Sequence, residues 1–122
     1  MRAATRNFIG LLALLTTLAA WAAGGNVEQA AKGWEMITAG ALLVDVRSSE
    51  EYAEGHIEGA VNIAHTETAA LAELIGPGHD RPVVLYCGSG RRAGLAQAAL
   101  EALGYSGVFN ATGYEALQAT QP

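Results

Sequence analysis

Short apolar runs alternate with helix-length segments along most of this 122-residue chain. The runs have the length of strands and span residues 41–46, 59–64, 82–87 and 108–110. In 41–46 and 82–87 the apolar residues are consecutive rather than alternating, which is typical of strands buried on both faces. The alternation predicts an α/β fold, with a mainly parallel sheet of four to five strands and helices on both faces.

Helices are expected between the strands, and capping residues or glycines mark their ends. They span about residues 26–38, 48–54, 66–75, 91–103 and 114–119. Asn26 can cap the first of them, and Ser48 with Glu51 fits a capping box at the start of the second. The apolar face of the first helix is predicted to comprise Ala30, Ala31, Trp34 and Ile37. A glycine follows each of the first four helices, which supports these boundaries.

The first 22 residues have the pattern of a secretory signal peptide. Arg2 and Arg6 precede an apolar run of about 13 residues, and Ala20 and Ala22 fit a small-x-small cleavage site. The alternative is a permanent membrane anchor, but a spanning helix needs about 20 apolar residues. We therefore predict a signal peptide over 1–22, a single domain over 23–122, and a periplasmic protein without stable membrane association after cleavage.

Charge and cysteine content exclude several classes of function. The chain has a formal net charge of −5, and residues 23–122 hold five basic against twelve acidic residues, which gives −7. Such a domain lacks the basic face that nucleic acid requires. One cysteine cannot form an internal disulfide or a thiolate zinc site. Metal-ligand spacing is also missing from the three histidines, His56, His65 and His79. We expect no nucleic-acid partner, metal or cofactor.

The single cysteine, Cys87, stands at the carboxyl end of the run 82–87, where open parallel sheets bind their ligands. Gly88, Ser89 and Gly90 follow, and a helix is expected to begin at Arg91 or Arg92. A tight turn into a helix N-terminus points backbone N–H groups at one spot and favours an anion there. The same environment favours the thiolate form of a cysteine. Cys87 is therefore the predicted nucleophile, and the amides of 88–92 are the predicted anion-binding loop.

The side chains of this loop allow more than one role. Ser89 is either a turn residue or a substrate contact, and Arg92 either binds loop carbonyls or contacts substrate. Arg91 is expected to project toward the mouth of the site and attract anions. Cysteine phosphatases use Cys-x5-Arg, but here the arginine is at Cys-x4-Arg and the next position is Ala93. The shorter loop suits one sulfur atom rather than a phosphate.

The absence of a second cysteine also narrows the chemistry. Thiol–disulfide exchange of the Cys-x-x-Cys kind lacks its resolving thiol. A thiolate that accepts a sulfane sulfur needs no second cysteine, because it becomes a persulfide and then gives the outer sulfur to an acceptor. Two alternatives stay open: a persulfide carrier or regulatory sulfur-binding module, and a small phosphatase or arsenate reductase of related fold.

Three segments resemble the signatures of the rhodanese family of sulfurtransferases, over about residues 40–117. They are Leu43–Arg47 with Glu51 and Tyr52, Gly55–Ile63, and the six-residue loop Cys87–Arg92. With the signal peptide, the chain is most similar to the single-domain periplasmic, phage-shock-type members. The resemblance implies a persulfide on Cys87, thiosulfate or another sulfane-sulfur donor, and cyanide or a thiol as acceptor.

Residues outside the loop are expected to be structural. Asp45 and Arg47 are predicted to form a hydrogen-bonded pair that supports the neighbouring loop, because an unpaired buried charge would be costly. His56 is predicted to stabilise a turn. A solvated acidic face is predicted to comprise Glu50, Glu51, Glu54 and Glu58. The family often has a strand before the first helix, which only residues 24–27 could supply here, and a serine or threonine where Ala93 stands.

Overall fold

The computed structural model describes residues 26–122, so the predicted signal peptide lies outside the described residues. Four parallel strands form one sheet in the order β2-β1-β3-β4. They are β1 (Leu42–Asp45), β2 (Val61–Asn62), β3 (Val83–Cys87) and β4 (Val108–Gly113). The helices are residues 26–38, α2 (Ser49–Glu54), α3 (Thr68–Ile75), α4 (Arg91–Ala102) and α5 (Tyr114–Thr120). The predicted α/β fold with a parallel sheet is confirmed.

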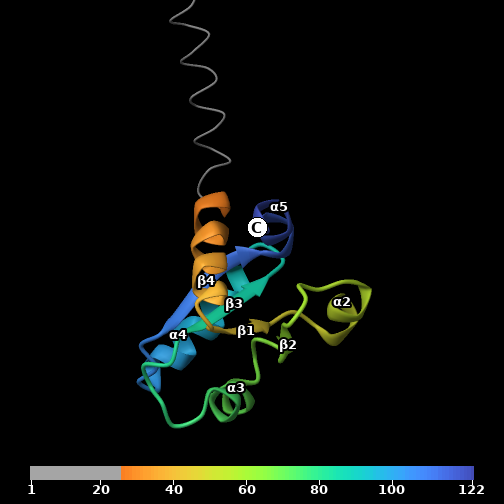
Figure 1. Ribbon diagram of the computed structural model, residues 1–122. Helices are drawn as coiled ribbons and strands as arrows, with labels where there is room; N and C mark the ends of the chain where they lie inside the picture. Colours follow the sequence, from red (N-terminus) through yellow and green to blue (C-terminus); the bar gives the residue numbers. More distant parts are fainter. Residues whose placement is uncertain (1–25) are drawn as a thin grey trace, which may run out of the picture.

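Helices cover both faces of the sheet and create two apolar cores (Figure 1). On one face, α3 and α4 contribute Leu71, Ile75, Ala93, Ala96 and Leu100. On the other face, the helix 26–38 and α5 contribute Ala30 and Leu117. The central strands are therefore buried on both sides, which explains why their sequences are continuously apolar.

Strand β3 is the most buried strand, since all five of its residues are buried. Val83, Leu85 and Cys87 point into the core under α3 and α4, whereas Val84 and Tyr86 point into the opposite core. Successive side chains of a strand alternate between the faces of the sheet. The side chain of Cys87 consequently lies on the face that α4 covers.

The carboxyl ends of β1 and β3 meet in the middle of the sheet. These strands are adjacent, with Asp45 opposite Tyr86, and the N–H of Val46 donates to the carbonyl of Tyr86 at 2.9 Å. From β1 the chain goes to β2 on one side, and from β2 it crosses back to β3 on the other side. In open parallel sheets, ligands usually bind beyond the strand ends at such a change of winding direction.

Several predicted boundaries are wrong in detail. β2 spans two residues instead of 59–64, and α3 begins at Thr68 rather than Thr66. β4 extends to Gly113 instead of ending at Asn110, because its last residue still pairs with Cys87 across an irregularity in the ladder. Residues 26 and 27 are helical, so they supply no strand before the first helix.

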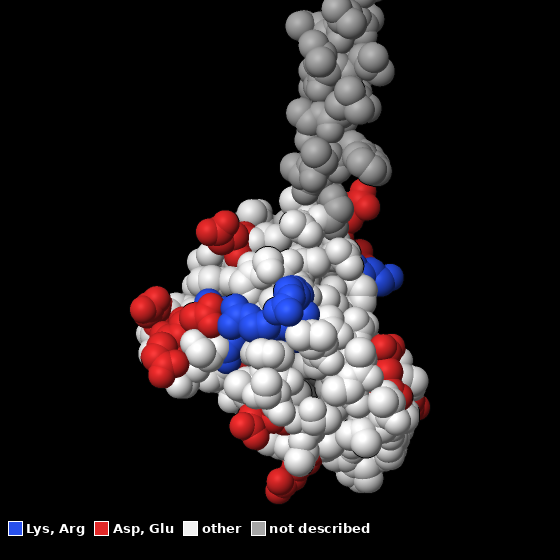
Figure 2. Space-filling model, turned by 180° about the vertical axis from the view of Figure 1, so that it is seen from behind, with Lys and Arg blue, Asp and Glu red and all other residues white. Residues whose placement is uncertain are grey.

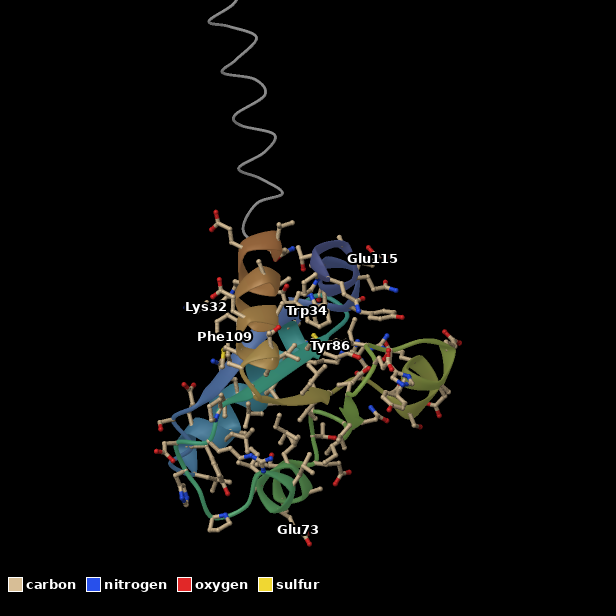
Figure 3. The ribbon with its side chains drawn as sticks, in the orientation of Figure 1. Lys32, Trp34, Glu73, Tyr86, Phe109 and Glu115 are labelled. Atoms are coloured by element: carbon tan, nitrogen blue, oxygen red, sulfur yellow. The ribbon has the colours of Figure 1, made fainter. Side chains whose placement is uncertain are left out.

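The buried face of the helix 26–38 also differs from the prediction. Ala31 is exposed, and Gly33 is buried in its place. Ala30, Gly33, Trp34 and Ile37 form the packed stripe, which has the i, i+3, i+4, i+7 spacing of one helix face. Trp34 lies between this helix and α5 (Figure 3), and its Nε1 donates to the carbonyl of Leu117 at 2.8 Å. Within residues 26–122, no helix is long and apolar enough to cross a membrane.

The close contact at Gly33 generates a stability prediction. A Cβ at this position would lie 2.7 Å from the Cβ of Ala111 in β4. We expect Gly33→Ala to lower the free energy of unfolding by about 1–3 kcal/mol, because the helix must move away from the sheet. Gly94→Ala is the matched control in α4, since its Cβ would lie 3.5 Å from Asn110 Nδ2.

The control should be neutral or stabilising by up to about 1 kcal/mol, owing to the helix propensity of alanine. Urea unfolding followed by circular dichroism measures both changes. Equal effects of the two substitutions would contradict tight packing at Gly33.

Candidate active site

The thiol of Cys87 lies where β3 ends and α4 begins. The residue is fully buried, and the N–H of Gly90 donates to its Sγ at 2.9 Å. Gly90 has φ 99° and is the N-cap of α4, so the chain turns there through the left-handed conformation that glycine adopts most easily. The left-handed turn thus brings a backbone donor onto the sulfur at the first turn of a twelve-residue helix.

The sequence predicts that several backbone amides of residues 88–92 point at the sulfur, but within 26–122 a single amide reaches Sγ. Among the residues that the structure describes, Gly90 supplies the only hydrogen bond to Sγ. Gly88 and Ser89 are exposed, and Gly90 is half-buried. The loop therefore separates the buried thiol from solvent.

The end of β4 supports the loop from the side opposite to solvent. Asn110 Nδ2 donates to the carbonyl of Gly90 at 2.9 Å, and Asn110 Oδ1 accepts the N–H of Thr112 at 2.9 Å. A side chain on Gly113 would collide with the carbonyl oxygen of Gly88. Thr112 has a φ of 74°, which is uncommon for a residue with a Cβ, and it packs against Gly90. Nothing in the sequence signals these contacts, because they depend on the pairing of β4 beside β3 and on the extension of β4 beyond residue 110.

Arg92 binds a carboxylate rather than loop carbonyls. Its Nη1 and Nη2 donate to Oε1 and Oε2 of Glu51 at 2.7 and 3.1 Å. Of the two roles predicted for Arg92, the binding of loop carbonyls is wrong, since the guanidinium donates to the carboxylate in α2 instead. The prediction that Glu51 belongs to a solvated face holds only in part, because its side chain stays partly exposed while its carboxylate binds Arg92 at the end of the Cys87 loop.

Glu51 also forms the capping box at the start of α2, as the sequence predicts. Its Oε1 accepts the backbone N–H of Ser48 at 3.2 Å, while the Ser48 side chain accepts the N–H of Glu51, so the predicted capping box is present. The hydrogen bonds from Arg92, aided by those from Ser48, lower the pKa of Glu51 to about 2. The hydrogen bond to Glu51 likewise raises the pKa of Arg92.

Asp45 and Arg47 form the predicted hydrogen-bonded pair at the carboxyl end of β1. Arg47 Nε and Nη2 donate to the Asp45 carboxylate at 3.0 and 2.7 Å, and Nη2 also reaches the carbonyl of Gly55 at 2.7 Å. Both residues are buried. The hydrogen bond to Asp45 raises the pKa of Arg47. The pair thus connects the end of β1 to the residue that follows α2.

Aromatic side chains surround this pair. The guanidinium of Arg47 lies 4.5 Å from the ring centroid of Tyr114 and 5.6 Å from that of Tyr86. Tyr86, labelled in Figure 3, accepts the N–H of Ile57 with its hydroxyl at 3.0 Å, and burial raises its pKa. His56 stacks on Tyr52, and its Nδ1 lies 2.8 Å from the carbonyl of Tyr52, which fits the predicted turn-stabilising role.

Three arginines are therefore placed near the strand ends, in a chain with an excess of acidic residues. Arg47 and Arg92 each bind a carboxylate, whereas exposed Arg91 has no ion-pair partner within 26–122. Figure 2 shows basic side chains gathered on one face, next to acidic ones. Ala93, at the Cys-x5-Arg position, is fully buried. The arrangement can hold a thiolate and attract a small anion to it.

Known proteins resemble this chain over most of the described residues. A sequence profile of the rhodanese-like domain matches residues 29–120. Thiosulfate sulfurtransferase PspE of Escherichia coli (strain K12) is 37% identical over 70 residues, which are 57% of this chain and 67% of that protein. Thiosulfate sulfurtransferase GlpE of Pseudomonas putida (strain GB-1) is 35% identical over 85 residues, 68% of this chain and 74% of that protein.

Solved structures agree with these matches. A rhodanese with anions from E. coli has a TM-score of 0.58 at 34% identity, covering 62% of this chain and 89% of its own. The human single-domain sulfurtransferase TSTD1 has a TM-score of 0.61 at 32% identity, covering 72% of this chain and 90% of its own.

The lowered pKa of Glu51 predicts a pH dependence of stability. Its folded pKa is about 2 against an ordinary 4.5, so the stabilising contribution is complete above about pH 5 and is lost as the pH falls toward 2. Above pH 5, Glu51→Gln should lower the free energy of unfolding by about 0.5–1 kcal/mol, the scale of a half-exposed ion pair. The difference from wild type should then shrink between pH 5 and 2.

Denaturant unfolding at several pH values, with Glu50→Gln as control, measures this difference. A gap that stays constant down to pH 2 would show that the charge of Glu51 contributes nothing.

Proposed function

Because this chain belongs to the family of rhodanese-like domains, we propose that it is a thiosulfate sulfurtransferase that carries sulfur as a persulfide on Cys87. The observation that carries the proposal is the position of the Cys87 thiol at the end of β3, where the N–H of Gly90 donates to Sγ at the start of α4. The names of the relatives PspE and GlpE supply the donor, thiosulfate.

The reaction has two displacement steps. In the first, the Cys87 thiolate attacks the outer sulfur of thiosulfate; the S–S bond of thiosulfate breaks, and sulfite leaves with the electron pair. Cys87 then carries a persulfide anion. In the second step, cyanide or a thiolate attacks the outer sulfur, which yields thiocyanate or a new persulfide and restores the Cys87 thiolate. Charge is conserved in both steps, and neither a second cysteine nor a redox cofactor is needed.

The surroundings of Cys87 support each part of this scheme. The N–H of Gly90 and the N-terminus of α4 stabilise negative charge on Sγ and on the persulfide. Cys87 is buried beneath exposed Gly88 and Ser89, so the solvent side of this loop is the side from which the donor approaches. Exposed Arg91, which is free of an ion pair in the described chain, attracts the dianion. Asp45 and Arg47 hold the adjoining loop and take no part in the displacement.

The cellular location is part of the same proposal. The basic start, the apolar run and the Ala20–Ala22 pattern support export with cleavage after Ala22 and a periplasmic domain over 23–122. Intact-mass measurement of the protein purified from a periplasmic extract reports the cleavage site. A mass that includes residues 1–22 would contradict cleavage.

Cys87→Ala is the direct test of the mechanism. The wild-type chain should form thiocyanate from thiosulfate and cyanide, and the variant should form none above the uncatalysed rate, because the sulfur carrier is removed. Wild-type protein incubated with thiosulfate alone should gain the mass of one sulfur atom, which Cys87→Ala should not gain. Equal activity of both proteins would exclude Cys87 as the carrier.

The same experiment separates the enzyme from a carrier module. A persulfide that forms on Cys87 but is not passed to cyanide or small thiols would identify a persulfide carrier instead.

Arg91→Glu tests how the donor is attracted. Reversing this exposed charge should raise KM for thiosulfate by about fivefold and change kcat by less than about twofold, because a uniform contribution to binding leaves the chemical step unaltered. Lys32→Glu, on the exposed side of the helix 26–38, makes the same change of charge on the opposite face of the sheet and should alter neither constant. A loss confined to kcat would contradict simple attraction of the dianion.

A further inference from the structure

Arg92 ends the Cys87 loop, and the carboxylate of Glu51 compensates its positive charge. Both of its terminal nitrogens donate to the Glu51 carboxylate, at 2.7 and 3.1 Å. The side chains of Arg92 and Glu51 are 29% and 38% exposed, so water and small anions reach the pair. An anion that entered the site would compete with Glu51 for the same two donors.

Arg92 also lies against Gly88, the residue that follows the reacting Cys87. Its Nη2 lies 3.2 Å from the position that a Cβ on Gly88, the residue after Cys87, would occupy. The hydrogen bond to Glu51 is the main cause of its raised pKa, and Cys87 makes a smaller electrostatic contribution to the same rise. Arg92 is therefore within electrostatic reach of Sγ, although its donors point to α2.

We propose that Glu51 is a positioning residue that holds Arg92 away from the sulfur donor and thereby limits the affinity of the site for anions. This inference rests on the proposed function, because it concerns the thiosulfate and sulfite of that reaction. Thiosulfate and sulfite are both multiply charged anions, so a site that binds the first too tightly also retains the second. Compensation of Arg92 by Glu51 leaves Arg91 to attract the donor and lets sulfite leave.

The chain offers a clean substitution and a matched control. Glutamine also serves at this position of a capping box, so Glu51→Gln removes the charge while the start of α2 is kept. Glu50→Gln removes the same charge from the adjacent exposed position, and Glu50 makes no hydrogen bond or ion pair through its side chain in the described structure. A comparison of the two variants separates the contact with Arg92 from the change in net charge.

We expect Glu51→Gln to lower both KM for thiosulfate and kcat. With Glu51→Gln, Arg92 is free to bind the donor, so KM for thiosulfate should fall about threefold, inhibition by added sulfite should strengthen by a similar factor, and kcat should fall. Glu50→Gln should change none of these. In an Arg92→Gln background, Glu51→Gln should no longer lower KM. An unchanged or raised KM in Glu51→Gln, or an equal shift in Glu50→Gln, would overturn the inference.

A second readout does not depend on sulfur transfer. Cys87 is the only cysteine of the chain, so alkylation reports on its surroundings alone. The ratio of its rates with anionic iodoacetate and neutral iodoacetamide should rise about threefold in Glu51→Gln and stay constant in Glu50→Gln. If the wild-type chain transfers no sulfur, the proposed function fails, and this ratio still decides the role of Glu51. A constant ratio in Glu51→Gln overturns that role.

Discussion

The pairing of β3 between β1 and β4 is the constraint on which the site depends. It buries β3 on both faces, so that the strand ends at a buried Cys87, which lies opposite Gly113. Parallel pairing also brings the loops after β1 and β3 to the same edge of the sheet. The thiol, the start of α4 and the Asp45–Arg47 pair consequently lie together, although the two segments are about forty residues apart in the sequence.

Two ion pairs near the strand ends differ in what they do. Asp45 and Arg47 are buried, and their remaining hydrogen-bonding groups are satisfied by backbone partners such as the N–H of Arg47 and the carbonyl of Gly55. Removal of either partner would leave a buried charge, so this pair is fixed. Glu51 and Arg92 are partly exposed, and their contact is weak enough for an anionic ligand to compete with it. The buried pair is a fixed part of the fold, whereas the partly exposed pair adds less stability and sets the charge at the entrance of the site.

Sequence reasoning succeeded where the signal is local. The consecutive apolar residues of β3, the capping box of α2 and the position of Cys87 before a Gly-Ser-Gly turn are all properties of short segments, and the structure contains each of them. The Asp45–Arg47 pair was predictable for the same reason, since the two residues are neighbours on one strand end.

The features that the sequence did not predict depend on contacts between distant segments. Asn110 contacts Gly90 only because β4 pairs beside β3, and no periodicity in residues 108–113 indicates that contact. The capping box distinguishes Glu51 from its acidic neighbours, but nothing local indicates its contact with Arg92, which is 41 residues away in the sequence. The single hydrogen bond to Sγ is likewise a matter of the exact orientation of each peptide group, which glycine content alone does not determine.

The contact between Gly113 and Gly88 determines in which direction the site can make room. Even one additional carbon atom on Gly113 would collide with the carbonyl oxygen of Gly88, so β4 behaves as a rigid wall behind the loop. Residues 88 and 89 are exposed on the other side, so solvent rather than packed protein borders the loop there. If a sulfur atom added to Cys87 displaces this loop, the displacement is directed toward solvent and changes the shape of the molecular surface.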